Sequence, residues 1–185
     1  LSYYKFDEEE NPFLGWRAIR ISLDLKDVFK TQLRAILRAS AYGDIRIMYP
    51  MIISVDEFMA GNAILRACSA ELRRVNIPFH DSIQTGVMIE TPAAVLCAED
   101  LAKVVDFFSI GTNDLTQYLL AVDRGNQKIA RLYNSFHPAV LRAIRTVIQA
   151  GHKYDKLVGM CGEFASDEKA VPILLGMGLN EFSMA

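Results

Sequence analysis

Three chemically reactive side chains each stand at the end of a short run of apolar residues. They are the carboxyl groups of Glu90 and Asp114 and the thiol of Cys161. An apolar run that stops at such a residue and is followed by a helical pattern is typical of a buried parallel strand. In α/β folds, ligands bind at the carboxyl ends of the strands. The sequence therefore predicts an active site along one edge of a parallel sheet.

Glu90 and Asp114 form the first candidate pair. Carboxylate oxygens are the ligands that a hard divalent cation prefers, and Mg²⁺ is commonly held by one or two protein carboxylates together with substrate oxygens and water. Each acid could instead cap the helix that follows it and interact with the helix dipole. Two acids at the ends of neighbouring strands favour the metal interpretation.

Arg17 and Arg124 are the candidate cations. Arg17 follows the pair Gly15-Trp16, and Arg124 lies in a loop downstream of Asp114. A planar guanidinium can hold a phosphate or a carboxylate through two hydrogen bonds. An isolated arginine is usually a solvated surface residue, which is the interpretation for the arginines on helical patterns.

Cys161 differs from the other two cysteines. Glycines stand close to it on both sides, and it ends a strand pattern, so its thiol could act as a nucleophile or as a general acid. Cys68 and Cys97 fall within helical patterns and are expected to be small buried hydrophobes. The three histidines show no metal-ligand spacing and are expected at helix ends or on the surface.

The elements that must position these residues alternate between strand and helix patterns, which predicts parallel βαβ units and an α/β fold. Five clear strands are too few for the eight of a (β/α)8 barrel. An open doubly wound sheet remains possible on this pattern, although the lack of a glycine-rich nucleotide fingerprint disfavours it. A further short strand is possible near Leu14–Arg17. Strands are expected over 45–50, 85–89, 105–110, 157–161 and 181–184, and helices over 25–39, 114–121, 138–150 and 167–175, with two more helices beginning at 54 and 91.

The composition is that of one globular domain over residues 1–185. The chain is 51% hydrophobic and 23% charged, with a net charge of −2. It has no apolar segment of the roughly 18 residues that span a bilayer, and no basic cluster that would indicate a nucleic-acid surface. Three cysteines without a CxxC pair fit a reducing, cytoplasmic setting.

Several ordered motifs resemble the phosphoenolpyruvate–protein phosphotransferase family, which is enzyme I of the bacterial sugar phosphotransferase system. The resemblance covers essentially the whole chain and implies a TIM barrel of the phosphoenolpyruvate-utilising type. The barrel is expected to be truncated, with about five or six of its eight units present. The motifs are 11–17 (NPFLGWR), 86–92 (GVMIETP), 111–117 (GTNDLTQ), 120–126 (LAVDRGN), 159–163 (GMCGE) and 181–184 (EFSM).

The resemblance also implies a role for each candidate residue. Glu90 and Asp114 would hold Mg²⁺. Asn113 and Arg124 would bind phosphoenolpyruvate beside Asp114, and Arg17 would line the phosphate pocket. The last role is that of Cys161, which would donate the proton that converts the enolate to pyruvate.

In this family the phosphoryl group passes to a histidine of an N-terminal domain and then to the histidine phosphocarrier protein, and the enzyme is a homodimer. The histidine domain and two arginine motifs that begin the family's barrel are not found in the sequence, so the isolated chain is expected to be inactive. The alternatives are the barrel of pyruvate phosphate dikinase or phosphoenolpyruvate synthase, and a non-catalytic dimerisation or sensory module.

Overall fold

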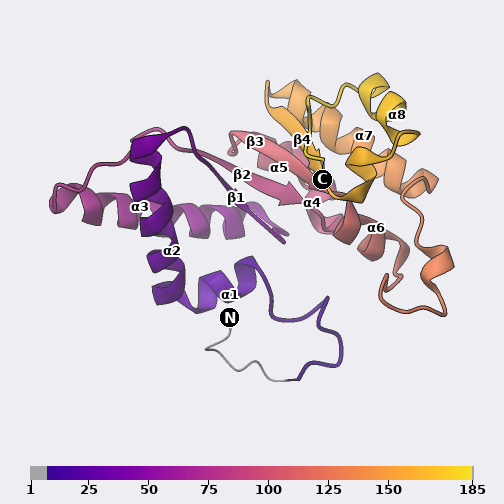
Figure 1. Cartoon of the computed structure of the whole chain (residues 1–185), viewed down its shortest axis with the longest axis horizontal. Coiled ribbons are helices and arrows are strands. Elements are labelled where there is room, and N and C mark those ends of the chain that lie inside the picture. The colour runs from indigo at the N-terminus through magenta and orange to yellow at the C-terminus, as the bar shows by residue number, and fades with distance from the viewer. Residues whose placement is uncertain (1–7, 185) are drawn as a thin grey trace.

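A computed structural model describes residues 8–184, which form a parallel sheet covered by helices (Figure 1). All five predicted strands are confirmed, and the four pairs of successive strands are all parallel. The order β1-β2-β3-β4-β5 has no reversal within these residues, unlike the order of a doubly wound sheet. The strands are β1 (Arg46–Tyr49), β2 (Gln84–Ile89), β3 (Phe107–Gly111), β4 (Leu157–Cys161) and β5 (Glu181–Phe182).

The helices from residue 55 onward connect successive strands, and two helices precede β1. Each expected helix is present, but the one expected from residue 91 is divided into two, and the helix at 19–24 was not expected. Figure 1 shows α2 and α3 at the left of the view and α6, α7 and α8 at the right. Among residues 8–184, no helix combines the length and hydrophobicity needed to cross a membrane. The helices are α1 (Ile19–Asp24), α2 (Lys26–Ala39), α3 (Val55–Arg74), α4 (Pro92–Leu96), α5 (Ala98–Ala102), α6 (Thr112–Leu120), α7 (Pro138–Lys153) and α8 (Ala170–Gly176), with short 3-10 turns η1 (Ser40–Tyr42), η2 (Ala130–Leu132) and η3 (Glu163–Ser166).

Hydroxyl caps start two of the helices that follow strands. The Ser54 hydroxyl accepts a hydrogen bond from the Glu57 N–H at 3.2 Å, at the position where a helix was expected to begin. Thr91 caps α4 in the same way, with its hydroxyl 3.1 Å from the Ala94 nitrogen, and it donates to the Ile52 carbonyl at 2.8 Å. Because Thr91 directly follows Glu90, these two bonds also fix the chain beside that carboxyl group.

The two faces of the sheet differ in composition. The face under the helices is apolar and almost fully buried, since residues at alternate positions point the same way along a strand. The opposite face carries small, flexible or polar residues such as Met88, Ser109 and Cys161, which are partly exposed. This second face ends at the carboxyl edge of the sheet, where the sequence predicted the active site. The apolar face consists of Ile47, Tyr49, Val87, Ile89, Phe108, Ile110, Val158 and Met160.

The sheet is curved, as one ion pair demonstrates. The Arg46 guanidinium on β1 lies 3.8 Å from the Glu181 carboxylate on β5. Four strand spacings of about 4.8 Å would separate these strands by about 19 Å in a flat sheet, which is too far for two side chains to bridge. The strands must therefore bend toward each other on the face that carries the ion pair.

The possible short strand near Leu14–Arg17 is not formed, because the Leu14 N–H turns back to the Asn11 carbonyl at 2.9 Å. Val75 directly follows Arg74, the last residue of α3, and is 56% exposed. The prediction for Cys68 is confirmed, whereas Cys97 is only half-buried against the core.

Candidate active site

The candidate carboxylates stand at the ends of β2 and β3. Glu90 is the first residue after β2, and its backbone leads into the cap of α4. Asp114 lies in the first turn of α6, which begins at Thr112 directly after β3. The helix therefore starts two residues earlier than predicted, and Asp114 belongs to the helix rather than to the strand end.

Asp114 brings the two candidate arginines together. Its Oδ2 atom lies 3.0 Å from the Arg17 Nη2 atom, and its Oδ1 atom lies 3.7 Å from the Arg124 Nη2 atom. The Asp114 side chain is only 10% exposed, and the arginine side chains are 31% and 37% exposed. Asp114 Oδ1 is buried and has no hydrogen-bond partner among the described residues. The predicted convergence of an acid and two guanidinium groups is therefore present.

Glu90 is buried beside this cluster. It is 4% exposed, and its Oε1 atom accepts a hydrogen bond from the Met51 N–H at 2.7 Å. Burial raises the pKa of Glu90 to about 7; the negative charge of Asp114 adds to the rise, whereas the Met51 hydrogen bond and the positive charge of Arg17 oppose it. Gly111 makes room for this carboxyl group, since a Cβ atom there would lie 2.7 Å from Glu90 Oε2.

Asn113 faces the loop after β4 rather than the arginines. Its Oδ1 atom accepts a hydrogen bond from the Glu163 N–H at 3.3 Å, and its carbonyl accepts one from the Tyr133 hydroxyl at 3.1 Å. Gly162 fits between the two loops with a φ of +100°, and a Cβ atom there would lie 2.6 Å from the Thr112 hydroxyl. The contact with Asn113 therefore ties the end of β4 to the start of α6.

Cys161 lies on the partly open face of the sheet. Its sulfur is 3.7 Å from the Ser109 hydroxyl and 3.7 Å from the Ile110 carbonyl. Burial raises the pKa of Cys161; the hydrogen bond from Ser109 opposes this rise and the charge of Glu90 adds to it. A neutral thiol is suited to giving up a proton and is a poor nucleophile. Of the two roles left open by the sequence, this environment favours the general acid.

The carboxylate pair has the composition of a magnesium site. No three His, Cys, Asp or Glu side chains within the described residues are grouped closely enough to hold a metal. Mg²⁺ accepts one or two carboxylates and takes its remaining ligands from substrate and water. Asp114 Oδ1 lacks a hydrogen-bond partner, and Glu90 is disfavoured as a bare anion, so a cation would satisfy both groups.

Sequence reasoning missed two aromatic residues that touch the arginines. The Tyr118 hydroxyl accepts a hydrogen bond from Arg17 Nη1 at 3.2 Å and donates one to the Phe13 carbonyl. The Phe13 ring lies under both guanidinium groups. Tyr118 could have been found from its spacing, because it lies four residues after Asp114 on the same helical face. No sequence signal identified Phe13.

Cavities flank this aromatic pair. One of about 360 Å³ is lined by Phe13, Gln117 and Tyr118, and another of about 310 Å³ reaches from Phe13 and Tyr118 to Met51 and Thr91. Both volumes fall in the lower range of small-molecule sites, which begins near 300 Å³. Neither cavity is lined by a candidate residue, but both lie beside Phe13 and Tyr118, which contact Arg17.

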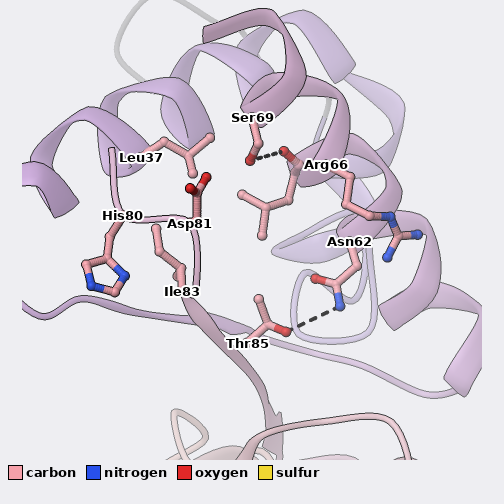
Figure 2. A pocket seen from close by; sticks show the side chains of 9 residues that line it. Leu37, Asn62, Arg66, Ser69, His80, Asp81, Ile83 and Thr85 are labelled. Atoms are coloured by element: carbon pink, nitrogen blue, oxygen red, sulfur yellow. Dashed lines mark hydrogen bonds between the residues drawn. The ribbon is translucent and has the colours of Figure 1, made fainter. Parts of the chain in front are cut away.

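A separate pocket of about 210 Å³ lies at the other end of the sheet (Figure 2). Figure 2 shows Asn62 and Arg66 on α3, with His80 and Asp81 on the loop before β2. The Asn62 amide donates to the hydroxyl of Thr85, the second residue of β2, at 3.3 Å. This pocket has charged groups of both signs, but it lies away from the carboxyl edge where the candidate residues gather.

The parallel sheet and the acidic, arginine-rich edge agree with the family comparison. Over residues 1–185, the chain matches the PEP-binding domain of PEP-utilising enzymes, and it therefore belongs to that family. The resemblance found in the sequence motifs is confirmed.

Curated relatives narrow the comparison further. The chain is 58% identical to the phosphoenolpyruvate-protein phosphotransferases of Buchnera aphidicola subsp. Acyrthosiphon pisum and of Haemophilus influenzae, and 54% identical to that of Mycoplasma capricolum. Each alignment covers 100% of this chain and 32% of the relative. The chain thus spans about a third of the length of these enzymes.

A solved structure supports the fold assignment. The chain superimposes on a citrate lyase from Burkholderia xenovorans LB400 with a TM-score of 0.58 and 24% sequence identity. The superposition covers 77% of this chain and 43% of the citrate lyase. At this identity the similarity concerns the fold alone.

Proposed function

We propose that this chain is the substrate-binding part of an enzyme that transfers the phosphoryl group of phosphoenolpyruvate to a histidine. In the proposed reaction the bond between phosphorus and the enol oxygen breaks, and a new bond forms between phosphorus and a histidine nitrogen of an N-terminal domain. The histidine phosphocarrier protein then receives the group, which is the first step of sugar uptake by the phosphotransferase system. The names of the 54–58% identical relatives support this assignment.

The observation that carries the proposal is the contact of two arginines with one buried carboxylate. Arg17 and Arg124 supply two planar cations, as a substrate with a phosphate and a carboxylate requires. Asp114 and Glu90 stand next to them with oxygens suited to a divalent cation. An anionic substrate and a metal could therefore meet at this edge.

In the proposed site, Glu90 and Asp114 hold Mg²⁺. When bound, the ion neutralises part of the negative charge on the transferring phosphoryl group. Arg17 and Arg124 bind phosphate or carboxylate oxygens of the substrate and limit its motion. Asn113 keeps the loop after β4 against α6, so that Cys161 stays on the same edge as the substrate.

Cys161 supplies the proton in the second half of the proposed reaction. When the phosphoryl group leaves, the enolate of pyruvate carries a negative charge that its methylene carbon shares. The neutral Cys161 thiol donates its proton to this carbon, which gives pyruvate and a thiolate. The raised pKa of the thiol, caused by burial, supports this role because the proton is present at neutral pH.

We further propose that the curved sheet is part of a (β/α)8 barrel. Sequential parallel order and the Arg46–Glu181 ion pair across β1 and β5 support a closed wall of strands. A barrel would place Glu90, Asp114 and Cys161 at its carboxyl face, where the active sites of such barrels lie.

The experiment is a phosphoryl-transfer assay on the intact protein with isotopically labelled phosphoenolpyruvate. We expect labelled phosphohistidine in the presence of Mg²⁺ and very little in the presence of a chelator. Arg124→Lys should reduce transfer strongly, because an ammonium group cannot reproduce the two parallel hydrogen bonds of a guanidinium. Arg34→Lys, at an ion pair on α2 far from the site, is the matched control. Labelling that does not depend on the metal would refute the proposal.

A further inference from the structure

The ring of Phe13 lies against both candidate arginines. The guanidinium carbon of Arg17 is 5.8 Å from the ring centroid, and that of Arg124 is 6.0 Å away. Both distances are within the range in which a cation is attracted to the negative face of an aromatic ring. The two arginines are 107 positions apart in the sequence, and Phe13 lies on the turn that leads to the first of them.

Tyr118 holds this turn in place. Its hydroxyl donates to the Phe13 carbonyl and accepts from Arg17 Nη1 at 3.2 Å, so one group contacts both the backbone of the turn and the side chain at its end. Burial raises the pKa of Tyr118, and the hydroxyl therefore keeps the proton that it donates. The 11–17 segment is thus attached to α6 at a defined point.

Helix α6 organises the second arginine as well. The side-chain oxygen of Gln117 accepts a hydrogen bond from the Arg124 N–H at 3.1 Å. Asp114, Gln117 and Tyr118 occupy positions i, i+3 and i+4, which face the same side of a helix. One helical face therefore contacts the side chain of Arg17 and both the backbone and the side chain of Arg124.

The two guanidinium groups repel each other, so a nearby negative charge or negative surface is needed to hold them close together. Asp114 supplies one negative charge, and the ring of Phe13 supplies a negative face without adding a formal charge. The two guanidinium groups carry two positive charges and Asp114 carries one negative charge, so the arginine pair keeps a net positive charge. Such an arrangement can accept a further anion without breaking its own contacts with the ring.

We infer that Phe13 and Tyr118 are positioning residues that hold Arg17 and Arg124 as one preformed pair for the anionic groups of the substrate. This inference rests on the proposed function, because it assigns the anion to phosphoenolpyruvate. Neither aromatic residue touches the reacting atoms. By holding the two arginines in place beforehand, they reduce the conformational entropy that these side chains lose when an anion binds.

A purely structural role would have a different signature. If Phe13 only filled space under the turn, an aliphatic residue of similar size would preserve anion binding. If the aromatic face positions the arginines, leucine should weaken anion binding and tryptophan should restore it, because tryptophan keeps a π surface. Tyr118→Phe keeps the ring and removes only the hydroxyl that contacts Phe13 and Arg17.

The test is calorimetric titration of the intact protein with phosphoenolpyruvate and, separately, with inorganic phosphate, both with Mg²⁺. We expect Phe13→Leu to weaken the binding of both anions about tenfold, as the loss of two cation–π contacts predicts. Phe13→Trp should bind within about threefold of the unmodified protein. Tyr118→Phe should weaken binding about fivefold, with an unchanged affinity for Mg²⁺ alone.

Phe79→Leu is the matched control, because Arg73 lies 5.6 Å from that ring in a pair outside the site. Its anion affinity should equal that of the unmodified protein, and thermal unfolding of each variant checks that the fold is kept. Equal binding by the unmodified protein, Phe13→Leu and Tyr118→Phe would overturn the positioning role. Phosphate binding that follows this pattern without any binding of phosphoenolpyruvate would overturn the proposed function and leave the positioning role standing.

Discussion

Replacing Asp114 with asparagine should change anion binding in opposite directions with and without a divalent cation. In this structure Asp114 contacts both Arg17 and Arg124, and so competes with any anion for the same two guanidinium groups. Asparagine has nearly the same shape but no charge. Without metal, Asp114→Asn should therefore bind phosphate more tightly than the unmodified protein. With Mg²⁺ it should bind phosphoenolpyruvate less tightly, because one metal ligand has lost its charge.

The size of the metal-free gain follows from the burial of the ion pairs. Solvent-exposed pairs contribute about 0–1 kcal/mol, and removing one partner of a fully buried pair costs about 3–5 kcal/mol. Asp114 is 10% exposed, whereas Arg17 and Arg124 are 31% and 37% exposed, so this cluster lies between the two cases. A competition of about 1–2 kcal/mol corresponds to about 5- to 30-fold tighter phosphate binding.

The assay is titration of phosphate into the unmodified and variant proteins in the presence of a chelator, followed by titration of phosphoenolpyruvate with saturating Mg²⁺. Glu71→Gln is the matched control, because it removes the carboxylate of the Arg34–Glu71 pair at 2.8 Å on the far helices. That variant should leave both titrations unchanged. If Asp114→Asn binds phosphate more weakly in chelator, Asp114 positions the arginines instead of competing with the anion, and the reasoning is refuted.

Three other substitutions test the remaining site residues. Burial raises the pKa of Glu90 to about 7, so Glu90 binds its proton more tightly in the folded than in the unfolded protein. This stabilises the fold by about 4 kcal/mol below about pH 4.3, and the contribution is lost as the pH rises through 7. Glu90→Gln should therefore flatten the dependence of unfolding free energy on pH between 4 and 7 in denaturant titrations, and an unchanged slope would contradict the burial argument. Cys161→Ala should keep phosphoryl transfer from phosphoenolpyruvate but slow the phosphorylation of pyruvate in the reverse direction. In the unmodified protein, the Cys161 thiol should react with iodoacetamide more slowly at pH 7 than free cysteine does, because burial raises its pKa. Gly111→Ala places a methyl group against the Glu90 carboxyl and should weaken Mg²⁺ binding about tenfold by calorimetry; Gly43→Ala, in open space, is its control.

The strands and the edge where the site lies could be predicted because they depend on local patterns. Apolar runs ending at Glu90 and Cys161 identify buried strands, and the parallel arrangement follows from the alternation with helices. The carboxyl ends of such strands meet at one edge whatever the details of packing. This general rule places the candidate carboxylates and the thiol at the same end of the sheet.

The contacts of the 11–17 segment could not be predicted in the same way. Tyr118 and Phe13 are 105 residues apart, and no periodicity connects positions at that distance. A short strand was possible near Leu14–Arg17, but the segment forms a turn stabilised by the Leu14–Asn11 hydrogen bond. Tertiary contacts with α6, rather than local propensity, determine where Arg17 points.

The early start of α6 explains why the two arginines and Asp114, one of the proposed metal ligands, belong to one unit. Since the helix begins directly after β3, Asp114 is fixed by the sheet at one end, while Gln117 and Tyr118 extend the same face toward the arginines. A displacement of α6 would therefore move Asp114 and both arginine contacts together. Changes that shift this helix should alter the affinities for metal and anion in parallel, whereas changes at Phe13 should alter the anion affinity alone. A variant that weakens both metal and anion binding has therefore disturbed the helix, whereas a variant that weakens anion binding alone has lost the aromatic support under the arginines.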